Sequence, residues 1–154
     1  MRSVRAALAA TAVLAAVMPL ASPGVAQAAP SCNSFTTYSV TGGFMRVPTI
    51  GWDTGAYNCD LGRGNFGDAV RVIQVSMRRC MGQNIADDRD FGPKTEQAVK
   101  NVQTRLNEWY DAGLAVDGRY GPLTRRGGFA FAVFPTFATW IPREDGYCYY
   151  RIDP

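Results

Sequence analysis

The residues best placed to contact a ligand occur twice, in a pattern that repeats 29 positions further along the chain. The first copy, Asp88–Thr95, reads D-x-x-F-G-P-x-T, and the second copy, Asp117–Thr124, reads D-x-x-Y-G-P-x-T. Aromatic faces and carboxylates are groups that contact sugars and peptides in proteins. Glycine permits unusual backbone angles and proline favours the start of a helix, so each copy predicts a turn that leads into a helix. The threonine of each copy can cap that helix with its hydroxyl oxygen.

Seven residues in and around these turns are predicted to contact a ligand. Arginine fits this role because its guanidinium pairs with a carboxylate through two hydrogen bonds. Structural roles stay open for several of the seven. The aromatic rings can pack in the core, the aspartates can bond their own turn backbone, and the glutamine can be a buried amide tied to the backbone. The predicted set is Asp88, Phe91, Gln103, Asp117, Arg119, Tyr120 and Arg125.

The sequence offers no convincing catalytic residue. The chain contains no histidine, which argues against histidine-held zinc and against Cys–His or Ser–His nucleophile pairs. A carboxylate pair of the kind used by glycosidases would have to come from ten aspartates and Glu96, Glu108 and Glu144. Glu96 falls in the first turn of a predicted helix, where a favourable interaction with the helix dipole explains it. We therefore predict a protein that is not an enzyme and needs no metal or cofactor.

Two helices should position these turns. The spacing of Val70, Ile73 and Met77 predicts an amphipathic helix over Asp68–Met81. A second helix is predicted over Lys94–Tyr110, with Trp109 and Tyr110 in the core at its end. A third helix after Thr124 should be short or distorted, because Gly127 and Gly128 disfavour helix by about 1 kcal/mol each.

Four cysteines, at positions 32, 59, 80 and 148, predict two disulfides. A zinc site is disfavoured because no CxxC pair exists. Three pairings are possible, and the layout favours Cys32–Cys59 and Cys80–Cys148. The first pair brackets the segment before the repeat, and the second ties the tail to the end of the first helix.

The N-terminal 28 residues are predicted to be a signal peptide. Arg2 and Arg5 precede the apolar run Ala7–Leu20, and Ala26–Ala28 fits the small-x-small cleavage pattern. Removing residues 1–28 leaves 126 residues, with 14 basic against 13 acidic side chains. This near-neutral charge balance does not predict binding to nucleic acid. Because there is no second long apolar run, the remaining residues are not predicted to insert into a membrane. An exported, monomeric protein is expected.

The segments on either side of the repeat are predicted to be coil or short strands. Four phenylalanines nearly alternate in the tail, at positions 129, 131, 134 and 137. If they were exposed, they would form a patch suited to a protein partner, whereas burial would favour a plain binding domain. A mostly α protein with two disulfide-tied extensions is therefore expected.

The central residues resemble the small three-helix peptidoglycan-binding domain family. Its first-helix motif, G-x-x-G-x-x-V-x-x-L-Q, matches Gly64, Gly67, Val70, Ile73 and Gln74, with Ile73 in the leucine position. The two turns and their helix match D-G-x-F-G-P-x-T-x-x-A-V-x-x-F-Q and V-D-G-x-x-G-P-x-T, with Arg89 in place of the first glycine and Val102 in place of the second aromatic residue.

The resemblance implies a compact three-helix domain at 62–128, between an N-terminal extension at 29–61 and an aromatic tail at 129–154. It also implies a secreted, wall-associated protein that binds the glycan or the stem peptide of peptidoglycan. A secreted protein-interaction or inhibitor module built on the same fold is the alternative.

Overall fold

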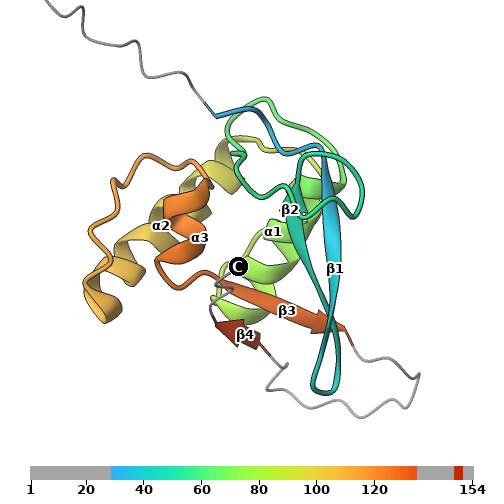
Figure 1. Cartoon of the computed structure of the whole chain (residues 1–154). Helices are drawn as coiled ribbons and strands as arrows, with labels where there is room; N and C mark the ends of the chain where they lie inside the picture. The colour runs from blue at the N-terminus through green and yellow to red at the C-terminus, as the bar shows by residue number, and fades with distance from the viewer. Residues whose placement is uncertain (1–28, 135–147, 151–154) are drawn as a thin grey trace, which may run out of the picture.

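The computed structural model describes residues 29–134 and 148–150 (Figure 1). The predicted signal peptide and Phe137 lie outside these residues. The elements follow the order β1, β2, α1, α2, α3, β3 and β4.

Three helices form the centre of the chain, close to the predicted ranges. Helix α1 spans Asp68–Cys80, α2 spans Pro93–Tyr110 and α3 spans Pro122–Arg126. The prolines begin α2 and α3 because their fixed φ suits the first helical position. Helix α3 has only 5 residues and ends before Gly127, as the two glycines predicted.

The extensions form a β-sheet, so the expectation of a mostly α protein was wrong. Strands β1 (Ser34–Val40) and β2 (Gly43–Thr49) make a hairpin whose two-residue connection contains Gly42, with φ 88°. Aromatic and β-branched residues make up most of β1 and include Phe44, Val47 and Thr49 in β2, which favours sheet over coil. Pro48 lies inside β2, opposite Phe35, although prolines usually interrupt strands.

The C-terminal strands complete the sheet. Strand β3 (Ala130–Phe134) pairs with β2, and β4 (Cys148–Tyr150) pairs with β3, giving an antiparallel sheet in the order β1-β2-β3-β4. The two disulfides have the favoured pairing, Cys32–Cys59 and Cys80–Cys148. Helix α1 contacts the sheet on one side and α2 on the other, and so joins the two parts of the fold (Figure 1).

A continuous core links the sheet to the helices. Phe129 and Phe131 are fully buried and pack with Tyr120, at ring-centroid distances of 5.0 and 6.4 Å from it. The burial of these two phenylalanines favours a binding domain over an exposed aromatic patch in this part of the tail. In contrast, Trp109 and Tyr110 are exposed, so their predicted place in the core was wrong.

Within residues 29–134 and 148–150, no helix is long and apolar enough to cross a membrane. The same residues contain no cluster of side chains suited to hold a metal ion.

Candidate functional site

Each of the two turns is held by a glutamine from the preceding helix. At the first turn, the Gln74 amide nitrogen donates to the Asp88 carboxylate at 2.8 Å and to the Asp90 carbonyl and Thr95 hydroxyl, each at 3.0 Å. Its amide oxygen accepts the Arg89 N–H at 3.0 Å. Because Gln74 is almost completely buried, these bonds compensate for the burial of its amide.

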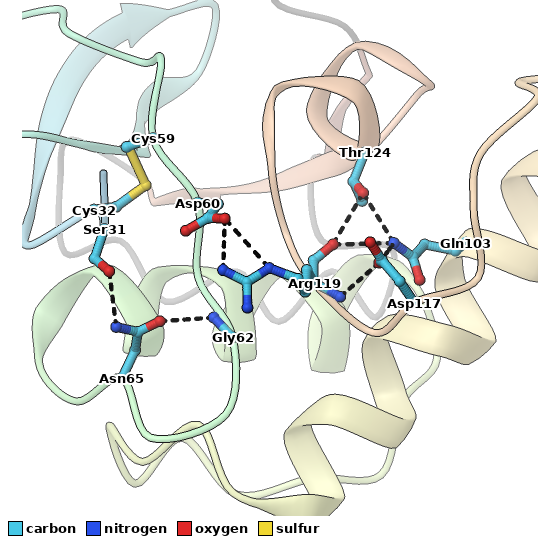
Figure 2. Close-up of polar contacts among 10 residues, drawn as sticks. All are labelled: Ser31, Cys32, Cys59, Asp60, Gly62, Asn65, Gln103, Asp117, Arg119 and Thr124. Carbon is cyan, nitrogen blue, oxygen red and sulfur yellow. Dashed lines mark hydrogen bonds and ion pairs between the residues drawn. A yellow bond between two sulfur atoms is a disulfide. The ribbon is translucent and has the colours of Figure 1, made fainter. Parts of the chain in front are cut away.

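Gln103 makes the same set of contacts at the second turn (Figure 2). Its amide nitrogen donates to Asp117, to the Arg119 carbonyl and to Thr124, at 2.8, 3.0 and 3.1 Å. Its oxygen accepts the Gly118 N–H at 2.9 Å. The sequence repeat is therefore also a structural repeat. In each copy, one buried glutamine amide forms hydrogen bonds with the backbone and side chains of the turn.

The threonines belong to this arrangement and do not cap helices, contrary to prediction. Thr95 and Thr124 donate their hydroxyl protons to the carbonyls of Asp90 and Arg119, at 3.1 and 3.2 Å. In the described part of the chain, no side chain caps α2 or α3, whose N-cap residues are Gly92 and Gly121.

Both turns have the same shape even though the first lacks the glycine of the second. Arg89 has φ 68° and Gly118 has φ 76°, so both lie in the left-handed region. That conformation costs a non-glycine residue about 1–2 kcal/mol. The Arg89 side chain forms an exposed ion pair with Asp68 at 2.9 Å.

A small hollow of about 160 Å³ lies beside the second turn, and we call it the turn hollow. Three of the predicted residues, Gln103, Asp117 and Arg119, line it together with Asp60 and Leu123. The Arg119 guanidinium pairs with the Asp60 carboxylate at 2.6 Å, joining the N-terminal extension to the turn (Figure 2). The turn hollow therefore combines charged and amide groups on one side with an exposed leucine on the other.

A larger groove of about 550 Å³ adjoins the turn hollow, and we call it the α3 groove. Leu114 and Leu123 line both, while Tyr110 and Arg126 line the α3 groove alone. Gly127 and Gly128 line this groove, and a Cβ at either position would crowd a neighbouring side chain of the groove. A Cβ at Gly128 would lie 3.0 Å from the Tyr110 ring. A Cβ at Gly127 would lie 3.1 Å from Leu114.

Of the seven predicted residues, the structure brings only those three to the turn hollow. Asp88 is exposed but belongs to the first turn, while Phe91 and Tyr120 are buried, so their rings are not on the surface. Arg125 is also buried, and its guanidinium lies 5.0 Å from the Tyr57 ring centroid.

Sequence reasoning missed the apolar half of the site. Leu123 is 71% exposed, and its position just after Pro122 could have marked it as a surface residue. Tyr110 was assigned to the core because helical spacing does not show where the core ends. Asp60 had no sequence signal, because it lies 59 positions from Arg119.

Hydrogen bonds and charges near the turns favour the ionised forms of Asp88 and Glu96. Hydrogen bonds from the Asp90 N–H and Gln74 lower the pKa of Asp88, and contacts with Lys100 and Arg63 lower the pKa of Glu96. A general acid of a glycosidase needs a raised pKa instead. Burial raises the pKa of Tyr120, which keeps its hydroxyl neutral.

A known protein family matches the part of the chain that contains the two repeated turns. Residues 66–127 match the family described as "Putative peptidoglycan binding domain". A zinc D-Ala-D-Ala carboxypeptidase of Streptomyces albus G is 38% identical over 66 residues, which is 42% of this chain and 24% of that protein. The chain therefore spans about a quarter of the length of this curated relative.

A solved peptidoglycan-binding protein from Clostridioides difficile, in complex with glutamine hydroxamate, is 27% identical. The similarity covers 58% of this chain and 53% of that chain, with a TM-score of 0.42, which is too low to compare the folds in detail. The repeated turns lie within the matched range, and residues 66–127 are thus a domain of the peptidoglycan-binding domain family.

Proposed function

We propose that this protein binds peptidoglycan through the turn hollow and the α3 groove. The observation that carries the proposal is that the two adjoin each other, since Leu114 and Leu123 line both. The charged residues Asp117 and Arg119 lie at one end, and the exposed side chains of Leu123 and Tyr110 lie towards the other. Peptidoglycan offers amides and carboxylates on its stem peptides and apolar faces on its sugars, so it can satisfy both ends.

The surface character of these groups indicates a modest affinity. Exposed hydrogen bonds contribute about 1 kcal/mol each, and bonds to charged groups somewhat more. A micromolar dissociation constant corresponds to about 8 kcal/mol, which a few such contacts and the burial of Leu123 can supply. Added salt should weaken the charged contacts.

A matched pair of double variants tests the location of the site. Leu123→Gln with Arg126→Gln alters the α3 groove, while Phe66→Gln with Lys94→Gln makes the same kind of change beside the first turn. Phe66 is 73% exposed and pairs with Asp90, so the control removes an equally exposed apolar side chain and one positive charge. Co-sedimentation with purified wall sacculi should fall about tenfold for the first double variant and stay unchanged for the control.

Equal binding by both double variants would contradict the proposed site. Chitin serves as a second solid phase, since it carries N-acetylated sugars without peptides. Retention on both polymers would indicate glycan recognition, and retention on sacculi alone would indicate stem-peptide recognition. Failure to bind either polymer would overturn the proposed function.

We further propose that the protein is exported and acts at the cell wall without hydrolysing it. The signal-like residues 1–28 and the two disulfides support an oxidising location outside the cytoplasm. The absence of histidine in the chain and the lowered pKa values of Asp88 and Glu96 support a non-catalytic role. The turbidity of a wall suspension should therefore stay constant after the protein is added, and a reproducible fall would contradict this role.

The alternative, a protein-interaction or inhibitor module, has less support. It relied on the disulfides and on exposure of the four tail phenylalanines, of which Phe129 and Phe131 are fully buried and Phe134 is half-buried, while Phe137 lies outside the described residues.

A further inference from the structure

A second hollow lies on the opposite part of the fold, between α1 and the sheet, and we call it the arginine hollow. It has a volume of about 120 Å³ and is lined by Phe35, Arg46, Val72, Val75, Arg79 and Phe134, with three charged residues at its edge. Since a water molecule occupies about 30 Å³, the hollow has room for a group the size of a short-chain acid.

Two guanidinium groups in this hollow lie on the same aromatic ring. The Cζ atoms of Arg46 and Arg79 lie 5.5 and 5.3 Å from the centroid of the Phe134 ring. Arg46 also lies 4.7 Å from the Phe35 ring centroid, within a small stack of aromatic side chains. Cation–π contacts hold both groups in place but leave their positive charges unneutralised.

The nearby carboxylates are already engaged with other arginines. Asp87 pairs with Arg71 at 3.5 Å and with Arg78 at 3.0 Å, and Asp68 pairs with Arg89 at 2.9 Å. Among residues 29–134 and 148–150, no ion pair involves Arg46 or Arg79. Among the described residues, the two guanidinium groups therefore share the Phe134 ring without an ion pair of their own, because Asp68 and Asp87 at the edge of the hollow pair with other arginines. An anion would relieve the repulsion between these two like charges.

The side chain of Arg46 also has an unused donor. Its Nε atom is buried and, within the described residues, has no hydrogen-bond partner. A buried donor without a partner costs about 1–3 kcal/mol, so a ligand that accepts from it gains affinity. Carboxylate oxygens fit guanidinium donors best, and the phenyl and valine side chains fit an apolar body.

We propose that the arginine hollow binds a small carboxylate with an apolar body, held between Arg46 and Arg79 over the Phe134 ring. The carboxylate accepts hydrogen bonds from the two guanidinium groups, and its carbon chain packs against Val72, Val75 and Phe35. The site is separate from the turn hollow and the α3 groove and does not depend on peptidoglycan binding.

The test is a titration of the oxidised protein, followed by two-dimensional amide NMR, with butyrate and its neutral isostere butyramide. Butyrate should shift the backbone amides of Arg46, Val75 and Arg79 in a saturable manner, and butyramide should not. Arg79→Gln should weaken butyrate binding about tenfold, because a charged hydrogen bond is lost. Arg79 is exposed, so this variant should fold, and Lys94→Gln is the charge-matched control that should bind as the parent does.

Further arms distinguish the source of the carboxylate. Tighter binding of N-acetylalanine than of butyrate would assign the hollow to a peptide C-terminus, and the reverse order would assign it to free organic acids. The proposal is overturned if butyramide shifts the same amides equally, or if Arg79→Gln binds butyrate as the parent does. It is also overturned if butyrate binds only to a Glu144→Gln/Asp145→Asn variant, since the chain's own carboxylates would then serve these arginines.

Discussion

At the scale of single residues, the two buried glutamines carry much of the structure of the turns. Gln103 contacts Asp117, Gly118, the Arg119 carbonyl and Thr124 through one amide group. No apolar side chain of similar size can replace these contacts. If an apolar side chain stood at position 103, the groups that bond Gln103 would have neither a donor nor an acceptor in its place.

Gln103→Leu should therefore lower the free energy of unfolding by about 3 kcal/mol or more, since several partners lose their bonds at once. Gln97→Leu on the same helix is the control, because exposed Gln97 bonds only Asn101, one turn away, among the residues that the structure describes. The control should change stability by less than about 0.5 kcal/mol. Urea denaturation measures both values, and a similar loss in the two variants would show that the amide network contributes little.

A second prediction concerns the equivalent positions 89 and 118. Gly118→Ala should cost about 2 kcal/mol or more, because its φ is positive and the new Cβ would lie 2.7 Å from the Glu96 Cγ and 3.2 Å from the Glu96 carbonyl oxygen. Arg89→Gly should change stability by less than about 1 kcal/mol. The relieved left-handed strain offsets the lost surface ion pair and the extra entropy of glycine in the unfolded chain.

Thermal denaturation of the two single variants checks this asymmetry. Equal destabilisation would mean that the two turns are packed alike, contrary to the contacts at Gly118.

At the scale of elements, we expect β4 to depend on its disulfide more than on its strand pairing. It has 3 residues and pairs only with β3 among the described strands. The Cys80–Cys148 bridge joins it to the end of α1 across a sequence separation of 68, against 27 for Cys32–Cys59.

Replacing both members of a bridge by serine should reveal this difference. In the chain-entropy account, loss of the longer bridge costs about 4 kcal/mol and loss of the shorter about 3.5 kcal/mol. Calorimetry of the Cys80→Ser/Cys148→Ser and Cys32→Ser/Cys59→Ser proteins should therefore show the lower melting temperature for the first. The opposite order would indicate that residual structure or native contacts outweigh loop length.

The elements also show what could be predicted from the sequence and why. The turns and α1 and α2 were predictable because the residues that shape them lie close together in the chain and recur at fixed spacing. Even the glutamine contacts span at most 21 positions. The sheet was not predictable in this way, because β2 pairs with β3 from the other end of the chain. The strand-like composition of Ser34–Thr49 was visible, but its partner strand was not.

The site shows the same division. Asp117 and Arg119 belong to the second copy of the repeat, and Gln103 lies on the helix that leads into it, only 14 positions before Asp117. Their proximity therefore involves a short stretch of the chain. The turn hollow also needs Asp60 and Leu114, and the α3 groove needs Tyr110, which come together only through tertiary packing.

At the scale of the whole molecule, the absence of histidine predicts a flat pH profile near neutrality. Stability should change little between about pH 5.5 and 8, where histidine would otherwise titrate. The folded-state pKa values of Asp88 and Glu96 are lowered, so their stabilising contribution is present above their unfolded values and is lost as the pH falls through the folded ones. The melting temperature should therefore drop below about pH 4.

A series of melting curves from pH 2 to pH 8 measures this profile. Asp88→Asn should make the acid limb shallower, because the amide oxygen can still accept from Gln74 but does not titrate. A steep change between pH 6 and 7 in the parent would contradict the prediction.

The pairing of Phe44 with Phe134 has a consequence for the order in which the protein folds. A chain is made from its N-terminus, so the β1–β2 hairpin and the helices are available long before β3, which lies roughly ninety positions after its partner. Cys32 and Cys59 can meet early, while Cys80 must wait for Cys148. Completion of the sheet and closure of the second bridge are thus late, coupled steps, and until they occur β2 presents an unpaired edge to its surroundings.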